Sequence, residues 1–124
     1  MITDEQLFII EVFKLVPLNR AELLIQSPHL EILDMLRRMN FKEKIEGFKA
    51  IKLNKKNREI LTDEIIYNDI HQYIHQLKIF VDGEKIFEGY DGLEYGIFSK
   101  KFNIPESFKK RYKSKDMLMI SEDW

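Results

Sequence analysis

A two-residue turn signal places the strongest constraint on how this chain folds. Asp82-Gly83 stands between the β-prone runs 77–81 and 84–88. Both central residues of a two-residue hairpin turn need positive φ, which Asp and Gly tolerate better than most residues. The segment therefore predicts a β-hairpin and a sheet that is at least partly antiparallel.

Helical patterns are expected on the N-terminal side of the hairpin. Thr3 and Gln6 have the spacing of a capping box, which predicts the start of a helix. The residues that follow are mostly apolar, so the helix is expected to be largely buried and to end before Pro17. A second short helix is expected over residues 18–26. Ser27-Pro28 then predicts the start of a third helix, because Ser is a favourable N-cap and Pro fits the first helical position.

The middle of the chain predicts one strand and one longer helix. Residues 48–53 alternate mostly between apolar and cationic side chains, as a half-buried strand does, and residues 54–58 resemble a polar basic turn. Thr62 is expected to cap a helix that extends to Leu77. Its polar ridge would then carry His71 and His75.

The C-terminal part predicts three short elements. Glycines around residue 92 favour a tight turn that leads into a short helix over about 93–98. Pro105 is expected to open a basic helix with Phe108 and Tyr112 as its buried anchors. Residues 117–120 are short and apolar, which indicates a last strand.

The length and composition predict one domain over residues 1–124. The chain is 44% hydrophobic and has nine Phe, five Tyr and one Trp, which is enough apolar material to offset the entropy of ordering it. The predicted class is α+β, with N-terminal short helices packed on a small, mainly antiparallel sheet and a C-terminal β-hairpin.

The chain has no cysteine, which removes disulfides, thiolate metal sites and cysteine nucleophiles together. This fits a reducing compartment, and we expect a cytoplasmic protein. Residues 1–5 are acidic rather than basic, unlike a secretory signal. No apolar run approaches the roughly 18 residues that span a bilayer, so we expect no membrane partner.

The net charge is only −1, but the charges fall in blocks. Residues 42–58 carry seven basic and two acidic side chains, and residues 100–115 carry seven and one. Residues 59–99 carry nine acidic and two basic side chains. Such alternation folds either into separate acidic and basic faces or into a mixed surface, and the sequence leaves both open.

Two histidines suggest a metal site as one alternative. His71 and His75 are four residues apart, so on a helix both imidazoles would project to one side, as in zinc hydrolases. The position that supplies the general base in those enzymes is Gln72 here, and Gln takes no proton. A third ligand would have to arrive through folding from residues such as Glu64, Asp69 or His29. A small metal-dependent enzyme is therefore the second hypothesis.

No other pattern names a reaction or a cofactor. The glycines at 89, 92 and 96 match neither a phosphate loop nor a dinucleotide fingerprint, and no Gly-x-Ser-x-Gly elbow occurs. The expectation is therefore a non-enzymatic protein without a cofactor. The basic blocks 42–58 and 100–115 leave a nucleic-acid-binding regulator as a third hypothesis, although the acidic neighbours make nucleic acid an unlikely partner.

Three segments in the C-terminal part can be compared with known families: 78–83 (KIFVDG), 87–92 (FEGYDG) and the terminal 120–124 (ISEDW). They resemble the small immunity proteins of bacterial polymorphic-toxin and contact-dependent inhibition systems. The resemblance is one of type, in the C-terminal part only. It implies a single α+β domain without catalysis that binds a cognate protein toxin and blocks its active site or substrate access.

The expected partner-binding site lies in the acid-rich stretch. An interface combines aromatic anchors with a polar rim, and acidic groups complement a basic partner and speed association. Trp124 is a further candidate anchor. The predicted partner-binding residues are Asp82, Glu84, Glu88, Tyr90, Asp91, Glu94 and Tyr95.

Overall fold

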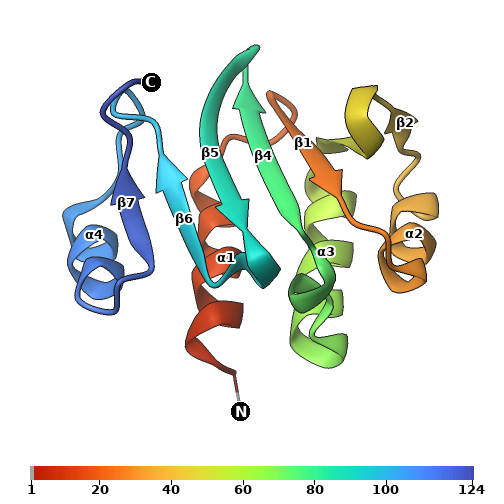
Figure 1. Ribbon diagram of the computed structural model, residues 1–124, viewed down its shortest axis with the longest axis horizontal. Helices are drawn as coiled ribbons and strands as arrows, with labels where there is room; N and C mark the ends of the chain where they lie inside the picture. Colours follow the sequence, from red (N-terminus) through yellow and green to blue (C-terminus); the bar gives the residue numbers. More distant parts are fainter. Residues whose placement is uncertain (1) are drawn as a thin grey trace.

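The computed structural model describes residues 2–124, which form a seven-stranded sheet with four α-helices (Figure 1). The helices are α1 (Asp4–Leu15), α2 (Leu30–Arg37), α3 (Lys55–Asn68) and α4 (Glu106–Lys113). The strands are β1 (Ala21–Gln26), β2 (Lys42–Glu43), β3 (Phe48–Leu53), β4 (Gln76–Val81), β5 (Glu84–Tyr90), β6 (Tyr95–Phe98) and β7 (Leu118–Ile120). Three 3₁₀ turns join them: η1 (Ile45–Gly47), η2 (Ile70–Tyr73) and η3 (Asp91–Leu93).

The sheet has the strand order β2-β3-β1-β4-β5-β6-β7. Every neighbouring pair is antiparallel except β6 and β7, which are parallel. The predicted α+β class with a mainly antiparallel sheet is confirmed. Strand β1 pairs with both β3 and β4. It therefore joins the strands of the N-terminal half to the β4–β5 hairpin in one continuous sheet.

Helices α1 and α3 lie behind the central strands in Figure 1 and cover one face of the sheet. The capping box predicted at Thr3 is present, and α1 buries Phe8, Ile9 and Phe13. Strand β1 alternates as a half-covered strand does: Ala21, Leu23 and Ile25 point to the core, and the residues between them are at least partly exposed. One hydrophobic cluster results, and buried side chains of all four helices pack in it against the sheet.

The opposite face of the sheet has no helix over it in Figure 1. We call it the open face. The pairing registers place there the residues of each strand that alternate with the core positions. They include Glu22 and Leu24 of β1, Lys78 and Phe80 of β4, Glu88 and Tyr90 of β5, Tyr95 and Ile97 of β6, and Met119 of β7.

The predicted β-hairpin is confirmed as β4 and β5. Asp82 and Gly83 have φ values of 50° and 85°, as a turn with two left-handed central residues requires. The register shifts between Ile79 and Phe80, which pair with Phe87 and Lys85, so Ile86 is the extra residue of a bulge. The hairpin lies in the middle of the sheet rather than at an edge.

Two predicted helices differ from the structure. Residues 18–26 were expected to be helical, but Ala21–Gln26 is a central strand, because its partners β3 and β4 override a helix-favouring composition. The middle helix begins at Lys55 rather than Thr62, with the Asn54 side chain accepting from the Asn57 N–H. It ends at Asn68, and residues 76–81 are strand.

The short helix expected over residues 93–98 is also wrong, because a 3₁₀ turn is followed there by strand β6. Gly96 pairs with Gly89, and a Cβ added at Gly96 would lie 2.3 Å from the Phe87 ring. The glycine gives the Phe87 ring room against the sheet. The predicted basic helix with Phe108 and Tyr112 buried is confirmed as α4, and the last strand is confirmed as β7.

Helix α3, with 14 residues, is the longest in the described part of the chain. Among residues 2–124, no helix combines the length and the apolar character needed to cross a membrane.

Candidate functional site

The seven predicted partner-binding residues do not form one cluster. All of them lie on the β4–β5 hairpin or directly after it, but β5 is seven residues long, so its two ends are roughly 20 Å apart. Asp82 and Glu84 lie at the turn end, Glu88 lies between the ends, and Tyr90, Asp91, Glu94 and Tyr95 lie at the opposite end.

At the turn end, Asp82 forms an ion pair with Arg20, the residue before β1, through both carboxylate oxygens. The hydrogen bond from Arg20 lowers the pKa of the Asp82 carboxyl, and the same contact raises the pKa of Arg20. The main chain repeats the link, since the Asp82 N–H donates to the Arg20 carbonyl at 3.0 Å. The hairpin tip is thus tied to the central strand.

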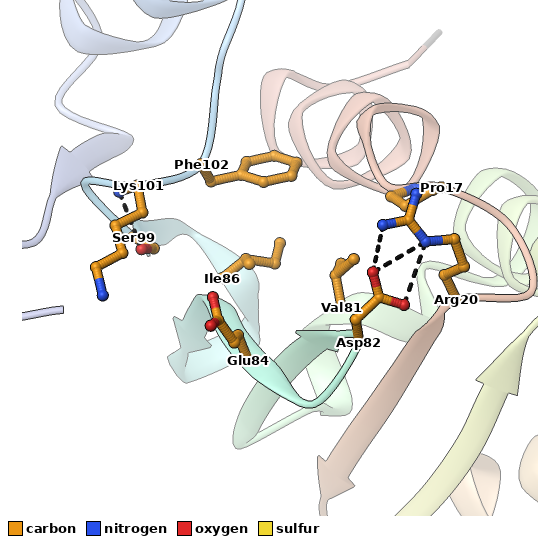
Figure 2. Close-up of a pocket in the computed structure, with 9 residues that line it drawn as sticks. All are labelled: Pro17, Arg20, Val81, Asp82, Glu84, Ile86, Ser99, Lys101 and Phe102. Atoms are coloured by element: carbon orange, nitrogen blue, oxygen red, sulfur yellow. Dashed lines mark hydrogen bonds and ion pairs between the residues drawn. The ribbon is translucent and has the colours of Figure 1, made fainter.

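A cleft of about 490 Å³ opens beside this pair (Figure 2). Figure 2 shows the apolar side chains of Val81, Ile86 and Phe102 between the Arg20–Asp82 pair and the opposite wall. That wall carries the exposed Lys101 and the buried Ser99, whose Oγ accepts from the Lys101 N–H at 3.1 Å. Two cations and two carboxylates, including Glu84, line the cleft, so its charges balance.

Glu88 is the charged centre of the open face. It is only 8% exposed, and its carboxylate accepts from Lys85 Nζ at 2.5 Å and from the Tyr90 hydroxyl. Burial alone would raise the pKa of Glu88, but the hydrogen bonds from Lys85 and Tyr90 outweigh it and the pKa is lowered. Burial and the neighbouring carboxylate raise the pKa of Tyr90 to about 12. Glu88 is therefore ionised and Tyr90 protonated at neutral pH.

Aromatic rings contact the two partners of this carboxylate, Lys85 and Tyr90. Tyr90 and Tyr95 are directly paired across β5 and β6, and their rings stack with centroids 6.0 Å apart. Lys85 Nζ lies 4.3 Å from the centre of the Trp124 ring, a cation–π contact that brings the C-terminal residue to the same face. We call Lys85, Glu88, Tyr90, Tyr95 and Trp124 the open-face cluster. It contains three of the predicted residues and the candidate Trp124.

The opposite end of the hairpin gathers the two remaining predicted residues in a second cleft, of about 310 Å³. We call it the acidic cleft. Asp91 and Glu94 meet Glu5 of α1 and Asp69 there, together with His71. Its lining residues are Thr3, Glu5, Asp69, His71, Gln72, Asp91, Gly92 and Glu94.

Local structure explains how the acidic cleft forms. Asp69 ends α3 in the left-handed conformation, and its carboxylate accepts from the Gln6 side chain, which also donates to the Ile65 carbonyl at 2.8 Å. This network holds the start of α1, with Glu5, against the end of α3. The N–H groups of Asp91 and Gly92 donate to the carbonyls of His75 and Ile74, at 3.0 and 2.9 Å, and fix the turn after β5 beside them.

His71 and His75 do not lie on one helix face, which corrects the geometry that the metal hypothesis needs. The chain leaves α3 before either residue: His71 is in the 3₁₀ turn η2 and buried, whereas His75 follows that turn and is exposed. The His75 ring instead contacts the His29 ring, with centroids 5.8 Å apart. Among residues 2–124, no three His, Asp or Glu side chains group so as to hold a metal ion.

The two basic blocks occupy opposite edges of the sheet. Block 42–58 includes β2 and β3 at one edge, and block 100–115 includes α4 beside β7 at the other (Figure 1). Part of the second block is neutralised, because Arg111 pairs with Glu11 of α1 at 2.7 Å. The acidic residues of the hairpin therefore lie between two separate basic edges rather than beside one continuous basic surface.

No protein-family model matches this chain, and comparisons with curated proteins and with solved structures also gave no match.

Proposed function

We propose that this chain is a non-enzymatic binding protein of the immunity type, which binds a cognate protein toxin in the cytoplasm and neutralises it. The observation that carries the proposal is the open-face cluster. A stacked tyrosine pair, a tryptophan and an ion pair are gathered on a sheet face that no helix within residues 2–124 covers.

The composition of the cluster is that of an interface hot spot. Tyr and Trp are enriched where a few residues supply most of the binding energy, because they bury a large area with few rotatable bonds. Tyr90, Tyr95 and Trp124 are each partly exposed, so their rings are accessible to a partner. Glu88 is already paired and desolvated by Lys85 and Tyr90, so covering it costs less than covering a free carboxylate.

The surroundings of the cluster also favour a protein partner. Ile97 and the 44% exposed Met119 continue the same face toward β7. These side chains add apolar area beside the tyrosine pair, and aromatic residues and Met are enriched in protein interfaces. The lack of cysteine fits the reducing cytoplasm in which such an inhibitor would act.

The test is capture of the partner with a matched pair of variants. Tagged wild-type protein and the double variant Tyr90→Ala/Tyr95→Ala are purified from cells that carry the native gene and its neighbours. Tyr67→Ala is the control, because Tyr67 is 77% exposed on α3. We expect one stoichiometric polypeptide with the wild type and the control, and at least a tenfold loss with the double variant.

The captured polypeptide must then behave as a toxin. Its expression alone should arrest growth, and co-expression of the wild type or Tyr67→Ala should restore it, whereas the double variant should fail. Circular dichroism establishes that the double variant is folded. A partner that binds the double variant equally, or one whose expression leaves growth unaffected, would overturn the proposal.

A further inference from the structure

An apolar groove lies on the open face, beside the open-face cluster. Its volume is about 500 Å³, and it lies between the turn η1 and the tip of the β4–β5 hairpin. We call it the open-face groove. Its apolar lining comes from Leu24 of β1, Ile45 of η1 and Phe80 of β4, and its polar lining includes Arg20, Glu22 and Lys44.

The turn η1 holds an apolar side chain in solvent at the edge of this groove. Ile45 is 80% exposed, the highest value among the large hydrophobic residues of 2–124. Glu46 follows it with a left-handed φ of 60°, which is costly for Glu. The Gln26 side chain donates to the Glu46 carbonyl at 2.7 Å, and the Lys44 N–H donates to the Phe48 carbonyl at 2.8 Å. Strained backbone that is held in place in this way is typical of ligand-binding sites.

Strand pairing places the open-face groove directly next to the open-face cluster. Phe80 in the groove is paired with Lys85 of the cluster. Lys78 is paired with Glu88 of the cluster on one side and with Leu24 of the groove on the other. Residues paired in this way have Cβ atoms about 5 Å apart. The groove and the cluster are therefore parts of one continuous surface across β1, β4 and β5.

The size of a protein interface requires more of this face than the cluster alone. A stable complex typically buries about 800 Å² on each partner, which is a patch roughly 30 Å across. Lys85, which is paired with Phe80, precedes Tyr90 by five residues on β5, so the groove lies roughly 15 Å from the tyrosine pair. A protein partner centred on the cluster therefore covers the groove as well.

The charges around the groove favour an acidic segment of that partner. Arg20 is paired with Asp82, and Lys52 stands directly opposite Glu22 in the strand register. Lys44 is exposed, and within residues 2–124 no carboxylate lies within 4.0 Å of its ammonium group. Lys44 is consequently a cation beside an apolar surface that the described chain leaves without a counter-charge.

We propose that the open-face groove receives one large apolar side chain of the toxin, from a segment in which a neighbouring carboxylate pairs with Lys44. The apolar side chain is buried against Leu24, Ile45 and Phe80, and the carboxylate adds specificity, because a segment with a cation at that place would be repelled. This inference rests on the proposed function and adds to it a second contact on the same face.

The chemistry of the groove is tested first without any partner. Nα-acetyl-phenylalanine, which carries a ring and a carboxylate, is titrated into the full chain with ¹³C-labelled methyl groups at low ionic strength. We expect saturable shifts of the Leu24 and Ile45 methyl signals, with a Kd of about 1–10 mM, as for one small group. Nα-acetyl-glycine, which lacks the ring, should leave these signals unchanged. No saturable shift with the phenylalanine probe, or equal shifts with both probes, contradicts the proposal.

The carboxylate contact is tested at Lys44. The uncharged Nα-acetyl-phenylalanine amide should bind about threefold more weakly than the acid, as one exposed ion pair predicts. Lys44→Gln should abolish this preference. Lys56→Gln, at an exposed lysine of α3 in the same basic block, should retain it. A preference that survives Lys44→Gln, or that both variants lose, refutes the pairing with Lys44.

A double variant with a matched control tests the assignment to the toxin. Ile45→Ala/Lys44→Gln should weaken binding of the captured toxin at least tenfold, because one buried aliphatic side chain and one ion pair are lost. Leu30→Ala/Lys56→Gln removes a similarly exposed aliphatic side chain and one lysine outside the groove, so it should change the affinity less than twofold. An equal loss in both double variants contradicts the assignment. Circular dichroism checks that both are folded.

The outcomes distinguish this inference from the proposed function. If Tyr90→Ala/Tyr95→Ala abolishes toxin binding whereas Ile45→Ala/Lys44→Gln binds as the wild type does, the groove assignment is wrong and the proposed function stands. A loss in both variants supports both. If no toxin is captured at all, the proposed function is wrong, and the assignment of the groove to a toxin side chain is wrong with it.

Discussion

The two ends of the β4–β5 hairpin carry the same kinds of side chain in opposite electrostatic settings. At the turn end Asp82 is held by Arg20, and Lys101 lines the same cleft as Glu84. At the other end, four carboxylates line one cleft in which the described residues place no cation. The turn end is consequently suited to hold the fold together, and the opposite end to attract a cation.

This difference arises from residues far away in the sequence. Arg20 reaches the turn end because β1 pairs with β4, whereas Glu5 and Asp69 reach the other end because α1 meets the end of α3. The local hairpin sequence has acidic residues at both ends and does not distinguish them. Tertiary structure therefore decides which carboxylates are structural and which remain free for binding.

The largest loss of stability is expected from a change at Phe87, because this buried ring anchors strand β5, which connects the two ends of the hairpin. Phe87 is fully buried between Phe8 and Phe98, with ring centroids 6.3 and 4.8 Å away. Phe87→Ala should lower the free energy of unfolding by about 3–5 kcal/mol, measured by urea denaturation. The exposed-site variant Tyr67→Ala should change it by less than about 0.5 kcal/mol. A loss below about 1 kcal/mol at Phe87 would show that the hairpin does not depend on this core.

A smaller loss of stability is expected from a change at Glu88. Like Asp82 at the turn end, Glu88 is paired with a cation, but unlike Asp82 it is buried. Glu88→Gln removes two charge-assisted hydrogen bonds, from Lys85 and Tyr90, and should cost about 1–3 kcal/mol at pH 7. The folded state lowers the pKa of Glu88, so the carboxylate stabilises the fold above its unfolded pKa, and this contribution is lost as the pH falls through the folded value.

The pH dependence gives the check on that prediction. Urea midpoints of the wild type and Glu88→Gln are measured from neutral pH downward. Their difference should begin to shrink near the ordinary glutamate pKa of 4.5 and vanish only below the lowered pKa of the folded state. A difference that stays constant across this range would mean that the charge of Glu88 contributes nothing and that only its shape matters.

Local signals in the sequence predicted the elements that depend on local chemistry. Asp82-Gly83 predicted the turn because both residues adopt positive φ at low cost, and Thr3 with Gln6 predicted the start of α1 through its own hydrogen bonds. Residues 18–26 were predicted to form a helix, but Ala21–Gln26 is a strand because it pairs with β3 and β4, which no local signal shows.

The site was predictable in part for the same reason. Its residues were expected on the hairpin, and the tyrosine pair and Glu88 do lie together there. Their division between two ends follows from strand length, and the acidic cleft requires Glu5 and Asp69, which no local pattern connects with Asp91. His71 was considered for metal binding because a helix was expected to continue through it, but the left-handed Asp69 ends that helix.

The smallest changes in stability are expected from neutralising carboxylates at the two ends of the hairpin, and these changes should have opposite signs. Asp91→Asn/Glu94→Gln relieves repulsion in the acidic cleft and should raise the free energy of unfolding by roughly 0.2–0.5 kcal/mol at low salt. Asp82→Asn keeps a residue that tolerates the turn but removes the partner of Arg20, so it should slightly lower the stability. Added salt screens exposed charges, and both changes should shrink toward zero in 1 M salt. If both variants shift the urea midpoint in the same direction, the contrast between the two ends is wrong.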